Sequence, residues 1–154
     1  MKNNPDLILR SATSEDYHAV MTLYRQLNPE DPVIDSTLGM PVFESIIASS
    51  KNILIVGEKQ QLIIASCYLN IIPNLTRNLR SYAVIENVIT DHAFRNQGVG
   101  KALMIYAMNL AWDAGCYKIM LLTGRKSPAT LHFYESCGFD PHTKTAFLAR
   151  NSKP

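Results

Sequence analysis

The chain has 154 residues, and 47% of them are hydrophobic, which is enough for one domain with a single sizeable core. Its 15 basic and 13 acidic residues give a formal net charge of +2 and form no basic stripe, so nucleic acid is not an expected partner. No segment approaches the roughly 18 apolar residues of a membrane span, and the N-terminal apolar run is too short for a signal peptide, so we expect a soluble, cytoplasmic protein without a membrane partner.

The N-terminal third predicts one strand and two helices. Residues 7–10, LILR, form a short apolar run typical of a strand. Thr13 follows and can cap a helix that runs to about Leu27, because acidic residues suit the positive end of a helix. Residues 28–40 are rich in proline and acidic residues and predict a long loop. A second helix is expected over 41–49, since proline is favoured at the first position of a helix.

The middle of the chain predicts three strands. Residues 53–58 and 62–72 are β-branched apolar runs separated by three polar residues, a pattern typical of an antiparallel hairpin. Residues 82–90, YAVIENVIT, predict a third strong strand.

The C-terminal third alternates helices and strands. A mostly buried helix is expected from Gly98 to residue 114, because small and apolar residues share one of its faces. Residues 118–123, KIMLLT, predict a strand buried on both faces. Ser127 and Pro128 predict the start of a helix that ends near residue 136, and residues 145–150 predict a final edge strand.

The predicted order is therefore βααβββαβαβ, which indicates an α/β fold with helices covering a mixed sheet. The strand at 82–90, the helix that follows it and the strand at 118–123 form one crossover unit. We expect residues 1–154 to be a single domain. The three cysteines and four histidines are scattered without the spacing of zinc ligands, so no metal site is expected.

The stretch RNQGVGKA, residues 95–102, resembles a phosphate-binding loop. A Walker A loop is excluded, because Arg95 stands where its first glycine belongs and Ala102 stands where a magnesium-binding hydroxyl belongs. A dinucleotide fingerprint is disfavoured, because Leu103 stands at its third glycine.

A third pattern, [Arg/Gln]-x-x-Gly-x-[Gly/Ala], is met by Arg95, Gly98 and Gly100. Residues without side chains let the backbone curl around a diphosphate, so that N–H groups and the positive end of a helix point at it. A plain turn at the start of a helix would meet the same pattern.

These segments resemble the GNAT superfamily of acyl-CoA-dependent N-acetyltransferases. The resemblance lies in IENVIT (85–90), FRNQGVGKALM (94–104) and HFYESCGF (132–139), in the family's order. GCYKI (115–119) and FYESCGF (133–139) are locally similar to the glucosamine-6-phosphate N-acetyltransferases.

The resemblance implies a GNAT-type fold that binds acetyl-CoA as cosubstrate where the strands at 82–90 and 118–123 splay apart. The pantetheine arm would pair with the backbone of Val88, Ile89 and Thr90, and the Ser127 hydroxyl could also reach the cofactor, although the family often has asparagine there. The pyrophosphate would lie on the backbone of Arg95, Asn96, Gln97, Gly98, Val99, Gly100 and Lys101.

Two residues are candidates for proton transfer. Glu86 is a lone carboxylate in an apolar run, so it either faces a wet cleft as a general base or lies on the outer face of its strand. Tyr134 matches the family's general acid, and a phenol pKa of about 10 against about 8.5 for a thiol makes it a plausible proton donor. The alternative for Tyr134 is a packed core aromatic.

The resemblance therefore implies an N-acetyltransferase that moves an acetyl group from acetyl-CoA to a primary amine by direct transfer. The alternative is a non-catalytic acyl-CoA-binding sensor module. The acceptor is a small-molecule or peptide amine, and Glu30, Asp31 and Asp35 either attract a cationic amine or are simply solvated. Many members of the family are homodimers, and the sequence leaves the oligomeric state open.

Overall fold

The computed structural model describes residues 6–151. The chain divides between Leu121 and Leu122 into two compact units. The first unit holds a five-stranded sheet with three α-helices, and the second holds one helix, α4 (Pro128–Ser136), followed by irregular chain. The mixed α/β class that the sequence predicts is confirmed.

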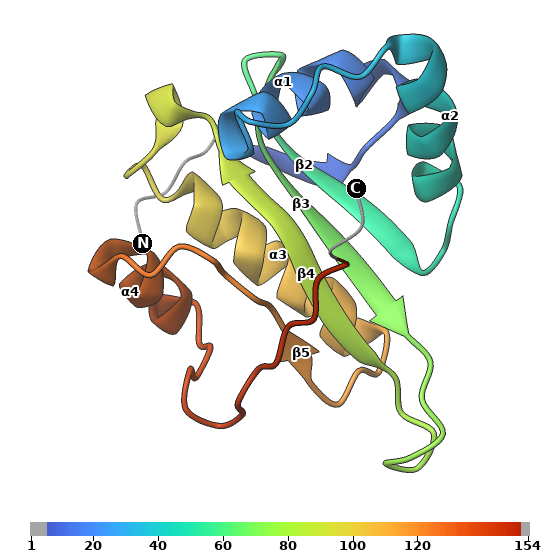
Figure 1. The fold of residues 1–154 in the computed structure, drawn as a ribbon, viewed down its shortest axis with the longest axis vertical. Helices are drawn as coiled ribbons and strands as arrows, with labels where there is room; N and C mark the ends of the chain where they lie inside the picture. Colours follow the sequence, from blue (N-terminus) through green and yellow to red (C-terminus); the bar gives the residue numbers. More distant parts are fainter. Residues whose placement is uncertain (1–5, 152–154) are drawn as a thin grey trace. The chain divides into compact units, whose positions relative to one another are not determined.

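The five strands lie in the order β1-β2-β3-β4-β5, so each strand pairs with its neighbours along the chain (Figure 1). The first three pairings are antiparallel and the last is parallel, which confirms the predicted mixed sheet and the crossover through α3. The strands are β1 (Ile8–Ser11), β2 (Asn52–Lys59), β3 (Leu62–Ile72), β4 (Tyr82–Thr90) and β5 (Ile119–Met120).

The hairpin between β2 and β3 turns on two residues, Gln60 and Gln61. Both have positive φ angles, 51° and 63°. Two left-handed residues in a two-residue loop form the turn whose twist matches that of paired strands. The predicted hairpin is confirmed. Its loop has two residues instead of the three expected, although the sequence lacks the Asn-Gly pair typical of such turns.

The two faces of the sheet bury different helices. Helices α1 (Tyr17–Leu27) and α2 (Ser36–Ile47) pack on the face that carries Leu54 and Val56. Helix α3 (Val99–Asp113) contacts β2, β3 and β4 and crosses behind β4 in Figure 1. Because strand side chains alternate between faces, Ile55, Leu69 and Ile85 belong to the α3 face, where they are fully buried with Leu103, Met104 and Ala107 of α3.

A buried carboxylate fixes the junction between β1 and α1. Asp16 ends a short 3₁₀ turn whose N-cap is the predicted capping residue, Thr13. The Arg10 guanidinium donates to Asp16 at 2.7 and 2.9 Å and also reaches Glu58 on β2. The hydrogen bond from Arg10 lowers the pKa of the Asp16 carboxyl, so this carboxylate stays ionised. The network therefore fastens the start of α1 to the sheet.

The second helix begins earlier than the sequence predicts. Helix α2 starts at Ser36, where the Asp35 carboxylate accepts from the Thr37 backbone N–H at 2.8 Å. Pro41 is therefore inside the helix instead of at its first position, and its missing N–H leaves one helical hydrogen bond unmade. The cap at Asp35 and burial of Phe43 against the core outweigh this loss.

Two strand predictions at the C-terminal side are corrected. The strand expected over 118–123 is reduced to Ile119–Met120, and both residues are half-buried, not buried on two faces. Residues 145–150 form no strand and are exposed throughout, with Phe147 at 92% exposure. An apolar run becomes a strand only where a neighbouring strand satisfies its backbone groups, and the sequence cannot show that partner.

Within residues 6–151, no helix has both the length and the hydrophobicity that a membrane crossing requires.

Candidate functional site

Strand β4 carries an extra residue in its middle. Ser66 of β3 pairs with Ile89 and Tyr68 pairs with Glu86, so the register shifts by one residue between these pairs. Asn87 lies in this interval with a φ of 52°, a left-handed conformation that asparagine tolerates better than most residues. Position 87 is therefore a β-bulge, a feature that often re-aims side chains beside binding sites.

Within residues 6–151, the second half of β4 is paired along one edge and has no strand partner along the other, which we call its open edge. Parallel pairing with β5 is confined to Ala83 and Val84, so β4 continues to Thr90 without a β5 partner. On its other side, Ile89 and Thr90 remain paired with β3. An unpaired strand edge offers N–H and C=O groups to an extended ligand.

The side chains of Val88, Ile89 and Thr90 are buried or half-buried in the sheet. Ile89 is buried at 3% exposure, and Val88 and Thr90 are half-buried. These side chains pack like those of an ordinary strand, so any contact with a ligand's amide groups would come from the main chain.

The loop after β4 is held in shape by its own side chains. Arg95 Nε donates to the Thr90 carbonyl at 3.1 Å, and Gln97 Nε2 donates to the Ala93 carbonyl at 3.1 Å. Asn96 has a φ of 60°, which helps to reverse the chain. Arg95 therefore folds the loop onto the end of β4, a role that its position in the motif does not reveal.

A second set of hydrogen bonds ties this loop to α1. The Gln26 amide donates to the Asp91 carboxylate at 2.8 Å, and its carbonyl accepts from the His92 backbone N–H at 3.2 Å. The hydrogen bond from Gln26 lowers the pKa of the Asp91 carboxyl. Neither Gln26 nor Asp91 belongs to a recognisable sequence motif, so this link could not be predicted from the sequence.

The N-cap of helix α3 has a backbone conformation that favours glycine. Gly98, the N-cap, has a φ of 84°, and a Cβ placed there would point into open space within the described chain. No side chain caps the helix and no acidic residue lies in its first turn. Val99 is buried and anchors the turn, whereas Gly100 and Lys101 are half-buried. The N–H groups and positive end of α3 are thus available to an anion.

Glu86 lies on the α1/α2 face of the sheet. It is paired with Tyr68, and Tyr68 is paired with Leu54, which belongs to the core beneath α1 and α2. Directly opposed residues in a sheet project from the same face, with Cβ atoms about 5 Å apart. The half-buried Glu86 is therefore the cross-strand neighbour of Tyr68 on this face.

A cavity of about 330 Å³ opens on this same face. It is walled by one side of α1, by α2 with the segment before it, and by the strands at Leu54, Tyr68 and Asn87. Tyr17 and Tyr24 contribute two further rings from α1. None of the described residues that line the cavity carries a charged side chain. Tyr68 and Asn87 connect this apolar space to Glu86 and to the bulge.

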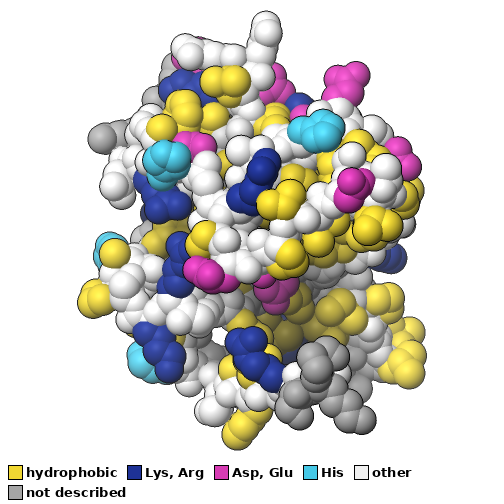
Figure 2. All heavy atoms as spheres, turned by 45° about the horizontal axis from the view of Figure 1, so that its top comes forward, with side chains coloured by type: hydrophobic (Ala, Val, Ile, Leu, Met, Phe, Trp, Pro, Cys, Tyr) yellow, Lys and Arg dark blue, Asp and Glu magenta, His cyan; other side chains and the backbone are white. Residues whose placement is uncertain are grey.

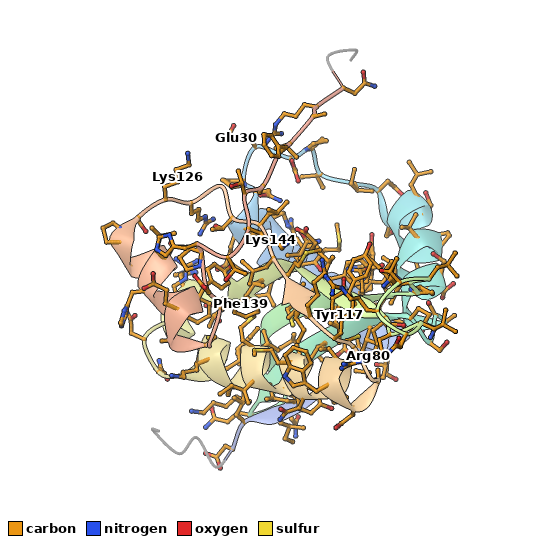
Figure 3. The ribbon with its side chains drawn as sticks, turned by 90° about the horizontal axis from the view of Figure 1, so that it is seen from below. Glu30, Arg80, Tyr117, Lys126, Phe139 and Lys144 are labelled. Carbon is orange, nitrogen blue, oxygen red and sulfur yellow. The ribbon has the colours of Figure 1, made fainter. Side chains whose placement is uncertain are left out.

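The close approach of α2 to α1 depends on Gly39. A Cβ at this position would overlap the Tyr17 hydroxyl. The Tyr17 ring in turn meets Phe43 edge to face at 5.4 Å, which fixes one wall of the cavity. Glu30 lies on the loop before α2 (Figure 3) and Asp35 is the helix cap, and neither lines the cavity.

Tyr24, a half-buried residue of α1, lines the cavity together with Asn87 of the bulge. Burial raises the pKa of Tyr24 to about 12, and the nearby side chains of Asn87 and Ser66 act in the opposite direction. The Ser66 hydroxyl is fully buried, and within residues 6–151 it has no partner in hydrogen-bonding geometry, so its proximity to Tyr24 falls short of a formed bond. Tyr24 and Tyr68 were not predicted from the sequence, because a tyrosine at helical or strand spacing looks like ordinary core.

The second unit carries the other two predicted residues. Ser127 is the N-cap of α4, as predicted, and its hydroxyl accepts from the Thr130 N–H at 3.3 Å. Tyr134 is half-buried on the same helix, and its ring meets those of Phe133 and Phe139 edge to face at 4.9 and 6.4 Å. Glu86, the open edge of β4 and the loop at 95–101 all belong to the first unit, whereas Ser127 and Tyr134 belong to the second. The roles of all these residues stay predictions.

Comparison with known proteins agrees with this arrangement. Residues 20–139 match the Acetyltransferase (GNAT) family. A glucosamine 6-phosphate N-acetyltransferase of Trypanosoma brucei brucei is 39% identical over 82 residues, which cover 53% of this chain and 54% of that protein. The match thus spans about half the length of this curated relative.

Solved structures match over nearly the whole chain. A protein from Agrobacterium tumefaciens str. C58 assigned as an acetyltransferase is 42% identical, with a TM-score of 0.89, covering 94% of this chain and 99% of that one. Glucosamine-6-phosphate N-acetyltransferase from Arabidopsis thaliana shares the fold, with a TM-score of 0.83 at 24% identity over 96% of this chain and 99% of that one. The family match covers most of the 154 residues, including β4, the Gly98 turn and α3. The chain belongs to the GNAT family of acetyltransferases.

Proposed function

We propose that this protein is an N-acetyltransferase that moves an acetyl group from acetyl-CoA to a primary amine by direct transfer, with residues 1–154 acting as one catalytic domain. The observation that carries the proposal is the junction of β4 and α3, where an open strand edge runs into an uncapped helix N-terminus. The open strand edge can pair with the amide groups of a pantetheine arm, and the helix N-terminus can bind a diphosphate.

The residues present fit acetyl-CoA. Gly98 leaves open space above the turn, and the first turn of α3 lacks the acidic side chains that would repel a diphosphate. The main chain of Val88, Ile89 and Thr90 would hold the extended arm, and the main chain of residues 95–101 would hold the diphosphate. The Ser127 hydroxyl is a further candidate contact. Acetyl-CoA supplies the acetyl group as a reactive thioester.

Proton transfer is assigned to two side chains. Glu86 would accept the proton that the amine loses as its nitrogen bonds to the acetyl carbon, directly or through one water. Tyr134 would donate its phenolic proton to the departing thiolate as the carbon–sulfur bond breaks. A backbone N–H near the bulge would stabilise the negative charge that develops on the carbonyl oxygen.

Direct transfer is favoured over an acyl-cysteine route. Burial raises the pKa of the Cys67 thiol to about 12, so this cysteine stays protonated and is a poor nucleophile. Cys67 is fully buried in β3, and Cys116 and Cys137 are buried as well. Attack by the amine itself needs no cysteine.

The proposal is tested by thermal shift with acetyl-CoA, CoA and ATP, followed by free-thiol release with a panel of primary amines. We expect both CoA compounds to stabilise the protein, ATP to have a smaller effect, and thiol to appear with at least one amine. No stabilisation by either CoA compound would contradict the proposal. Stabilisation without thiol release from any amine would favour an acyl-CoA sensor.

We expect Glu86→Gln to lower kcat/KM for the amine by about 10²-fold near neutral pH, because the amide keeps the shape but cannot accept the proton. The deficit should shrink as pH rises and more of the amine is already neutral. The measurement is the pH profile of thiol release, together with the Kd for acetyl-CoA, which should not change. Glu44→Gln, at an exposed position of α2, is the matched control. A Glu86→Gln enzyme with wild-type rates across the profile would remove Glu86 from the mechanism.

A further inference from the structure

The cavity under α1 and α2 is the part of the proposed site that carries information about the acceptor. It touches Asn87 of the bulge and Tyr68, the cross-strand neighbour of Glu86. Glu86 does not itself line the cavity, so an amine whose body filled this space would extend its nitrogen past Tyr68 or Asn87 to reach that carboxylate. All of the cavity's lining residues belong to the first unit.

The cavity's chemistry is apolar with a few neutral polar groups. Tyr17, Tyr24, Tyr68 and Phe43 surround it with aromatic rings, and the Asn87 amide and the tyrosine hydroxyls are its main hydrogen-bonding side-chain groups. A phosphate or a second ammonium group buried here would lose its hydration without gaining a charged partner from the lining, which is strongly unfavourable. An apolar body would gain free energy by leaving water.

The rim of the cavity is apolar as well. Leu38 and Val42 of α2 line it and are 70% and 60% exposed. Figure 2 shows hydrophobic side chains gathered on the side of the molecule where α2 lies. The volume of about 330 Å³ is at the lower end of the range for small-molecule sites.

From these observations we infer that the acceptor is a small primary amine with a single amino group on an aromatic or branched aliphatic body, and not an amino-sugar phosphate or a polyamine. This inference rests on the proposed function, since it assigns the cavity to the acceptor. It sets this chain apart from the relative whose name specifies glucosamine 6-phosphate.

The test compares 2-phenylethylamine, glucosamine 6-phosphate and spermidine in two assays: binding to the CoA-saturated protein by calorimetry, and thiol release with acetyl-CoA. We expect 2-phenylethylamine to bind and to have the highest kcat/KM, by at least about tenfold. The free energy gained by burying one phenyl ring is larger than the free energy that corresponds to a tenfold change in affinity. Preference for glucosamine 6-phosphate or spermidine, or no binding of 2-phenylethylamine, would overturn the inference.

Matched variants link binding to this cavity. The double variant Leu38→Ser/Val42→Ser changes two exposed rim residues, so the fold should persist, and circular dichroism would verify this. It should weaken 2-phenylethylamine binding about five- to tenfold. Leu62→Ser, at the start of β3 with 58% exposure and outside the cavity lining, should leave binding unchanged. Equal binding by the double variant and the wild type would overturn the inference.

The two assays separate this inference from the proposed function. Thiol release with spermidine or glucosamine 6-phosphate as the best acceptor would support N-acetyl transfer and refute the apolar acceptor. Binding of 2-phenylethylamine that depends on Leu38 and Val42, without thiol release from any amine, would support the apolar ligand and refute catalysis.

Discussion

Replacing Gly98 by valine is expected to weaken acetyl-CoA binding by more than about 100-fold, a loss of about 2.8 kcal/mol. Gly98 has a φ of 84°, which a β-branched residue adopts only under strain, and its missing side chain faces open space at the helix N-terminus. Valine would both distort the turn and fill the space over the N–H groups. The Kd for acetyl-CoA, measured by calorimetry, checks the result.

Gly115 provides a control for the strain itself. It lies just past the other end of α3 with a φ of 75°, and a Cβ added there would also meet open space. Gly115→Val therefore introduces a comparable backbone penalty away from the proposed diphosphate site and should lower the melting temperature while acetyl-CoA still binds. If Gly98→Val binds acetyl-CoA as the wild type does, the diphosphate does not lie on this turn.

Replacing Tyr134 by phenylalanine is expected to lower kcat about 10²-fold and to leave the Kd for acetyl-CoA within about twofold of wild type, because the proposed proton donor is removed while the ring is kept. The ring contacts with Phe133 and Phe139 do not involve the hydroxyl, so the packing of α4 should persist. Steady-state thiol release with a saturating amine gives kcat, and calorimetry gives the Kd.

Tyr117→Phe is the matched control for this variant. Tyr117 lies just before β5, where its ring meets that of Tyr82 edge to face at 6.5 Å, and Arg80 lies nearby (Figure 3). Its hydroxyl has no part in the proposed chemistry, so kcat should not change. Normal turnover by the Tyr134→Phe enzyme would show that the thiolate takes its proton from another group.

The sequence predicted what depends on local backbone chemistry. The Gly98 turn, the apolar strand 82–90 and the Ser127 cap each rest on a few neighbouring residues, and each is found in the structure. The helix start at Ser36 was also locally encoded by Asp35 and Thr37, but Pro41 was a stronger and misleading signal.

Features that depend on distant partners could not be predicted. The length of β5 is set by where β4 stops pairing with it, and residues 145–150, predicted as an edge strand, form no strand. The cavity depends on which face of the sheet α1 and α2 cover, and on the closeness that Gly39 allows to Tyr17. An asparagine at position 87 was the one available sign of the bulge.

The bulge at Asn87 has a consequence for how such a protein could change over time. Asn87 itself lines the cavity, and it separates a stretch of β4 that ends at Glu86 from a stretch, Val88 to Thr90, which offers its main chain at the open edge. In the proposed enzyme, side chains choose the acceptor and backbone holds the donor. Substitutions around the cavity could therefore redirect the enzyme to new amines while donor binding persisted, so that selection could act on the two substrates separately.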